Sequence, residues 1–94
     1  MNTDPCKYEV LVNGTKTHPA TWQDAIAEVM STSHGSIIRV WGPRNCDAVI
    51  AVLPKGTLDI AFMQYGMLVT GDLLHGHENL PTALRMARGW CIVD

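Results

Sequence analysis

The sequence predicts an α+β fold, a two-layer sandwich in which two helices cover one face of a mostly antiparallel sheet of four to five strands. Two observations predict it: apolar residues recur at helical spacing in two segments, and the segments between them alternate apolar and polar residues. The chain has 94 residues, the length of one small domain. We therefore expect a single domain over residues 1–94.

Two helices are expected from their apolar stripes and the residues at their ends. The apolar stripe of the first helix consists of Trp22, Ala25, Ile26, Val29 and Met30. Thr21 precedes it, and its hydroxyl can accept the N–H of Asp24, as in a capping box. Gly35 follows this helix in a position that suits a left-handed residue. Asn79 is expected to cap the second helix, and Gly89 to end it.

The remaining segments are expected to be strands joined by tight turns. Expected strands cover residues 6–12, 36–41, 48–53 and 58–63, with a short polar arm at 15–17 and a last strand at 90–93. Asn13-Gly14 tolerates the positive φ angles of a hairpin turn. Tyr65-Gly66 is expected to kink or bulge the strand before it, which then continues over 67–70 ahead of a polar loop at 71–77. A ferredoxin-like βαββαβ wiring is the named topology that fits this order best.

Charge and cysteine content exclude several classes of protein. Seven Lys and Arg against nine Asp and Glu give a net charge of −2, whereas phosphate-driven binding normally needs a basic chain, so direct nucleic-acid binding is not expected. Cys6, Cys46 and Cys91 form an odd, widely spaced set, which favours small apolar thiols in a reducing cytoplasm over disulfides. The longest apolar run, residues 48–53, is far too short to span a membrane, and no signal peptide is recognisable.

His75 and His77 are the candidate metal ligands. Alternate residues on an extended segment point the same way, so both imidazoles could approach one ion. A zinc site takes three or four ligands with supporting contacts, and only these two are close in sequence, so solvated loop histidines are the simpler interpretation. A metal-binding module or small metal-dependent enzyme therefore remains an alternative that needs a distant Cys or His. No catalytic constellation is recognisable, and neither enzyme activity nor a cofactor is expected.

An excess of adaptable apolar residues in one stretch indicates a protein-binding surface: Phe62, Met63, Tyr65, Met67, Leu68 and Val69. Methionine and aromatic side chains are favoured at protein contacts, although here they could also fill the space between sheet and helices. The expected partner-binding residues are Arg39, Trp41, Arg44, Asp59, Tyr65 and Met67. The edge of the strand over 58–70 could also pair two copies into a homodimer. The alternative role of Arg39, Trp41 and Arg44 is an oligonucleotide-binding surface, with base stacking beside arginines.

The first half of the chain resembles small α+β anti-CRISPR proteins, which are inhibitors made by phages and mobile elements. The segments that carry the resemblance are residues 8–12, the alanine-containing helix that follows, and residues 37–42 and 51–53. The resemblance implies a non-enzymatic inhibitor in the host-cell cytoplasm. Its implied partner is a host CRISPR effector complex, in which it blocks target DNA binding or nuclease recruitment. The family has no common catalytic motif, so no residue inherits a role from it.

Overall fold

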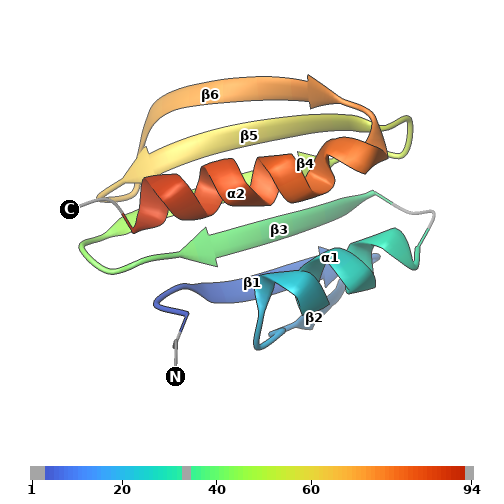
Figure 1. The fold of residues 1–94 in the computed structure, drawn as a ribbon, viewed down its shortest axis with the longest axis horizontal. Helices are drawn as coiled ribbons and strands as arrows, with labels where there is room; N and C mark the ends of the chain where they lie inside the picture. The colour runs from blue at the N-terminus through green and yellow to red at the C-terminus, as the bar shows by residue number, and fades with distance from the viewer. Residues whose placement is uncertain (1–3, 33–34, 93–94) are drawn as a thin grey trace.

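The structure is a computed structural model that describes residues 4–32 and 35–92. Within these residues, six strands form one sheet and two helices lie on one of its faces (Figure 1). In chain order the elements are β1 (Lys7–Val12), β2 (Thr15–Thr17), α1 (Trp22–Met30), β3 (Ser36–Trp41), β4 (Cys46–Val52), β5 (Thr57–Gln64), β6 (Met67–His75), the 3₁₀ turn η1 (His77–Asn79) and α2 (Leu80–Cys91). The α+β class is confirmed, with six strands in place of four to five.

The sheet is antiparallel throughout, in the order β2-β1-β3-β4-β5-β6. This wiring differs from the ferredoxin-like βαββαβ one, because four consecutive strands, β3 to β6, lie between the two helices and no strand of the described residues follows α2. The β1–β2 hairpin reverses the chain before α1, and β3 then pairs antiparallel with β1 on the side away from β2. Asn13 and Gly14 form its turn with φ of 50° and 81°, as the sequence predicts.

The expected kink at Tyr65-Gly66 is instead a complete hairpin turn. Their φ angles are 51° and 76°, and the chain reverses there to start β6 at Met67. The expected polar loop at 71–77 is therefore wrong, because β6 pairs with β5 as far as His75. A register shift beside Phe62 and Met63 leaves Val69 as an extra residue on β6, a bulge in the edge strand.

The expected last strand at 90–93 is also wrong for its described residues, because α2 continues through Gly89 to Cys91. Cys91 extends the buried stripe of the helix, and the Trp90 indole N–H donates to the Met63 carbonyl at 2.8 Å. These contacts outweigh the cost of about 1 kcal/mol that glycine brings to a helix interior. Val93 lies outside the described residues. Asn79 precedes α2 but does not cap it, since its amide donates to the His75 carbonyl at 2.6 Å.

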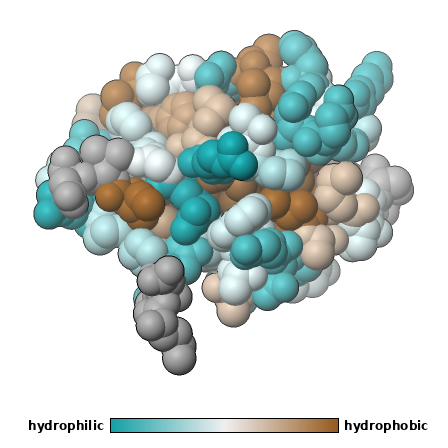
Figure 2. Space-filling model, viewed as in Figure 1, coloured by the Kyte–Doolittle hydropathy of each residue, from teal (hydrophilic) through white to brown (hydrophobic). Residues whose placement is uncertain are grey.

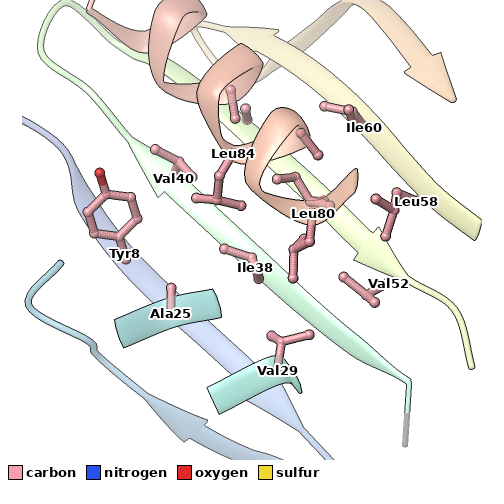
Figure 3. Packing of buried hydrophobic residues seen from close by; sticks show 14 of the residues in the cluster. Tyr8, Ala25, Val29, Ile38, Val40, Val52, Leu58, Ile60, Leu80 and Leu84 are labelled. Carbon is pink, nitrogen blue, oxygen red and sulfur yellow. The ribbon is translucent and has the colours of Figure 1, made fainter. Parts of the chain in front are cut away.

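The core lies between the two helices and the sheet (Figure 3). α2 lies over β3, β4 and β5, while α1 packs on β1 (Figure 1). The largest fully buried aliphatic side chains include Ile38, Ile50, Leu58, Ile60, Leu80 and Leu84. Cys6 and Cys91 are buried in the same cluster, so two of the thiols pack as small apolar groups, as expected.

On the helix-covered side, hydrophobic residues form separate patches between hydrophilic ones (Figure 2). Among the described residues, no helix has the length and apolar character needed to cross a membrane.

Candidate functional site

β6 is an exposed edge strand with apolar side chains. It ends the strand order, and every residue in it except Leu74 is exposed. The exposed fractions are 71% for Met67, 66% for Leu68, 54% for Val69 and 51% for Leu73. β6 contains no lysine or proline, the residues that most often protect an edge strand, while the bulge at Val69 and the charge of Asp72 interrupt its edge. Within the described chain no strand pairs with its outer side, so its backbone can accept another strand.

The opposite edge of the sheet is protected. β2 has only three residues, all exposed and polar. Lys16 Nζ in β2 lies 3.7 Å from Oε1 of Glu9. The other carboxylate oxygen of Glu9, Oε2, lies 3.4 Å from Nε2 of His18. A short, charged edge discourages strand addition. The two edges of one sheet therefore differ in their capacity to bind a further strand.

The apolar residues that the sequence singled out divide between core and surface. Phe62 is buried and packs at 5.5 Å, between ring centroids, from Trp90. Tyr65, in contrast, is 71% exposed at the turn before β6, close to the equally exposed Met67. Phe62 therefore fills the space between sheet and helices, whereas the apolar residues of the β5–β6 turn and of β6 lie on the surface. We call the exposed residues Tyr65, Met67, Leu68, Val69 and Leu73 the β6 surface.

Four of the six expected partner-binding residues line one open groove of about 570 Å³. Arg39, Trp41, Arg44 and Tyr65 meet there, between the β3–β4 turn and the β5–β6 turn, and we call this the arginine–aromatic groove. Met67 follows the groove as the first residue of β6. Asp59 lies elsewhere, on the sheet face opposite the helices, between Ala51 and Leu73 in register.

Two contacts hold the Arg39 guanidinium, one with Trp41 and one with Asp47. Its Cζ lies 4.7 Å from the centroid of the Trp41 ring, because residues two apart on β3 share a face. Its Nη2 is 3.3 Å from Oδ2 of Asp47, whose side chain is only 10% exposed. Asp47 pairs in register with Trp41, which places the carboxylate beside both groups. The guanidinium is thus held over the indole ring while the Arg39 side chain stays 46% exposed.

One backbone hydrogen bond joins the two turns of the groove: the Tyr65 N–H donates to the Asn45 carbonyl at 2.9 Å. Another closes the β3–β4 turn itself, where the Gly42 N–H donates to the Cys46 carbonyl at 2.9 Å. Arg44 and Asn45 both adopt left-handed conformations, with φ of 65° and 58°. Asn45 and Asp47 were missed from the sequence as groove residues. Asp47 could be recognised as a groove residue only from its pairing with Trp41. That pairing depends on the length of the β3–β4 turn.

The two candidate metal ligands are separated by a turn. His75 ends β6, Gly76 follows with φ of 96°, and His77 begins η1 with its Nε2 3.2 Å from the Leu53 carbonyl oxygen. The expectation that both histidines share one extended segment is therefore wrong. Among the described residues, no group of three or more His, Cys, Asp or Glu is placed to hold a metal ion. His34 lies outside those residues.

A second polar cluster, unexpected from the sequence, joins the N-terminal segment to α2. Asp4 accepts from the Tyr8 hydroxyl at 2.5 Å and lies 3.4 Å from Nη2 of Arg88. Burial raises the pKa of Asp4, but hydrogen bonds from Tyr8 and Cys6 N–H together with the Arg88 charge outweigh it and lower the pKa overall. Burial and the bond to Asp4 raise the pKa of Tyr8. These contacts are internal and point to a structural role.

The arrangement combines an open strand edge with a neighbouring cationic and aromatic groove, and Tyr65 belongs to both. Such a surface can add a strand by main-chain hydrogen bonds and select its partner by side-chain contacts. Comparison of the chain with protein families, curated proteins and solved structures finds no match in any of the three.

Proposed function

We propose that the chain is a protein-binding module that inhibits its partner by covering part of that partner's surface, without catalysis. The observation that carries the proposal is the exposure of Met67, Leu68, Val69 and Leu73 on an edge strand whose outer side no strand of the described chain covers. An extended segment of the partner would add to β6 as a seventh strand. Main-chain hydrogen bonds would supply affinity, and the exposed apolar side chains would supply specificity.

The size of β6 fits this role. A specific interface takes roughly 800 Å² from each partner. The chain exposes 5752 Å² in all, so such an interface would use about one-seventh of it. β6 has nine residues, eight of them exposed, and is followed along the sheet by half-buried apolar residues of β5 such as Ala61 and Met63. A partner strand on β6 would therefore meet exposed residues along most of its length and half-buried apolar residues beside it.

The proposed target is a CRISPR effector complex. This finer part of the proposal rests on the resemblance of residues 8–12, 37–42 and 51–53 to small anti-CRISPR proteins. An inhibitor that occupies a strand edge or groove of the effector would prevent target DNA from binding or the nuclease from joining. The chain would then act in the host-cell cytoplasm, where such complexes work.

The central experiment compares two matched variants of exposed apolar residues. Leu68→Glu places a charge in the β6 surface, and Met30→Glu does the same on α1, where Met30 is 52% exposed. Proteins captured by the tagged wild-type chain are identified, purified and reconstituted with it. We expect Leu68→Glu to weaken the reconstituted complex about tenfold, since burial of a leucine contributes roughly 1.5 kcal/mol or more. Met30→Glu should bind like the wild type.

Two outcomes would overturn the proposal. Equal binding by Leu68→Glu and Met30→Glu would remove β6 from the interface. A wild-type dimer in light scattering that Leu68→Glu converts to a monomer would assign β6 to a second copy of the chain. The CRISPR target is tested separately with purified effector complexes and fluorescent target DNA: the wild type should reduce DNA binding at stoichiometric amounts. An unchanged DNA affinity with every effector assayed would remove that target.

A further inference from the structure

We propose that the sheet face opposite the helices packs against the same face of a second copy of the chain. Both helices lie on one face of the sheet, and no helix of the described residues covers the other (Figure 1). Pairing between strands arranges the side chains of that other face in three rows. From β1 to β6 the rows are Leu11, Ile37, Ala51, Asp59 and Leu73; Glu9, Arg39, Val49, Ala61 and Gly71; and Lys7, Trp41, Asp47, Met63 and Leu68. We call these residues the uncovered face.

The uncovered face is more apolar than a sheet face in contact with water usually is. An antiparallel sheet with one solvated face alternates apolar residues toward the core with polar residues toward water. In β4, however, Val49 and Ala51 on the uncovered face alternate with core residues that are also apolar. Ala51 pairs with Ile37, which is 41% exposed, and Val49 pairs with Ala61. Continuous apolar runs of this kind are typical of strands that are covered on both faces.

The width of the uncovered face favours a sheet over a single helix as its cover. Neighbouring strands lie about 4.8 Å apart, so the strands from β1 to β6 that carry the rows span roughly 20 Å, whereas a helix is about 10 Å wide. A second copy supplies a sheet of the same width. With about 6.6 Å between successive side chains on one face, the rows offer roughly 500 Å² per copy, and about 1,000 Å² together, the size at which specific interfaces begin.

A twofold axis along the strands at the centre of the sheet gives a self-complementary contact. The centre of the order β2-β1-β3-β4-β5-β6 lies between β3 and β4. Rotation about an axis there places β3 of each copy over β4 of the other, and β1 over β5. Ile37 then lies over Ala51 of the second copy, and the reverse contact forms at the same time, so a large side chain meets a small one twice. Two sheets packed in this way keep their strand directions within about 30° of each other.

The same axis gives Asp59 a cationic neighbour. Because β1 lies over β5, Asp59 faces Leu11 of the second copy, and Leu11 pairs in register with Lys16 on β2. The Lys16 side chain is 56% exposed, and its ammonium group has further N–H donors besides the one directed to Glu9 at 3.7 Å. Within one copy, four strand spacings of about 4.8 Å separate Lys16 from Asp59, so these two side chains meet only between copies.

The outer edge of β6 stays open in this dimer. β6 lies over β2 of the other copy, and β2 has three residues and reaches only the row of Lys16, so Leu68 extends past it. The dimer therefore differs from one formed by pairing two β6 edges, and it carries two β6 surfaces.

Sedimentation equilibrium over a range of concentrations measures the dimer and its variants. Ile37→Glu should raise the dissociation constant about a hundredfold, since each dimer loses two buried isoleucines and each contributes about tenfold. Met30→Glu on α1 and Leu68→Glu on β6, which make the same kind of change at exposed positions, should dimerise like the wild type. A wild type that stays monomeric at its highest soluble concentration would overturn the proposal. A dimer that Leu68→Glu dissociates and Ile37→Glu does not would overturn it in favour of the β6 edge.

A zero-length cross-link tests the arrangement without a variant, so the test stands even if Ile37→Glu fails to fold. A carbodiimide condenses a carboxylate with an amine into an amide bond that contains no spacer. We expect two links to Lys16 in a mixture of isotope-labelled and unlabelled wild type. The Glu9 link should join peptides of one label, because Glu9 lies 3.7 Å away in the same copy, and the Asp59 link should also join labelled to unlabelled peptides. A wild-type dimer without the Asp59 link would contradict this packing, and neither measurement depends on the partner of the proposed function.

Discussion

Arg88 on α2 donates from Nε to the hydroxyl oxygen of Tyr8 on β1 at 2.8 Å, across eighty positions of the chain. Asp4 completes the cluster through the Tyr8 hydroxyl and the Arg88 guanidinium, and the Arg88 Cζ lies 6.0 Å from the ring centroid of Trp22 on α1. One arginine thus contacts the N-terminal segment, the first strand and the first helix. The cluster therefore joins the N-terminal end of the described chain to α2, the last helix.

Removal of the Tyr8 hydroxyl should weaken this connection. Tyr8→Phe keeps the buried ring but removes the donor to Asp4 and the acceptor for Arg88. We expect the free energy of unfolding to fall by about 2 kcal/mol, the usual contribution of a hydrogen bond with a charged partner. Urea denaturation followed by tryptophan fluorescence measures it. Tyr65→Phe, at a 71% exposed position, is the control and should change stability by less than about 0.5 kcal/mol.

Stability should also depend on pH through Asp4. The pKa of this carboxyl is lower in the folded chain than its ordinary value of 3.8, so the unfolded chain binds the proton more readily. The contribution of Asp4 is therefore present above about pH 4 and is lost as the pH falls through the folded pKa. In urea titrations from pH 6 to pH 2.5, wild type should exceed Asp4→Asn at neutral pH and converge with it in acid. A pH-independent difference between the two proteins would contradict this assignment.

Two glycines near the end of α2 should respond to alanine in opposite directions. A Cβ at Gly42 would lie 2.2 Å from the Cys91 carbonyl oxygen and 2.6 Å from its Cβ, so the end of α2 would have to move. We expect Gly42→Ala to cost about 2 kcal/mol or more. A Cβ at Gly89 meets nothing within 4 Å, and Gly89→Ala should add about 1 kcal/mol because alanine favours the helix. Thermal unfolding measures both, and destabilisation by both would show that α2 ends before Gly89.

Local patterns predicted the elements whose ends are determined by neighbouring residues. Thr21 accepts the Asp24 N–H at 3.1 Å, as its spacing predicts, and α1 begins at Trp22. The Tyr65-Gly66 turn was misinterpreted because apolar residues continue on both sides of it. A non-glycine residue with positive φ, such as Tyr65, is uncommon and is not indicated by propensity. The end of α2 was missed because Trp90 and Cys91 favour strands, while tertiary packing makes them helical.

The candidate site was predictable only in part, for a related reason. Arg39 and Trp41 share a strand face, which spacing alone predicts. Their meeting with Arg44 and Tyr65 requires the β3–β4 and β5–β6 turns to lie side by side, which depends on the antiparallel order of three strands. His75 and His77 are separated for the same reason: β6 pairs with β5 as far as His75, and the chain then turns at Gly76. The sequence pattern does not show which distant strands pair with each other.

The three thiols should differ sharply in reactivity. Burial raises the pKa of the Cys91 thiol to about 12 and raises that of Cys6 as well. At pH 8 a pKa of about 12 leaves only about one Cys91 in ten thousand as the reactive thiolate, and burial also blocks access. Cys46 is half-buried and lines the arginine–aromatic groove. We therefore expect one fast thiol per chain with an aromatic disulfide reagent, and two that react only when the fold opens.

Cys46→Ser should remove the fast phase and leave the slow one, whose rate should rise with urea. Two or three fast thiols in the folded wild type would contradict the burial of Cys6 and Cys91.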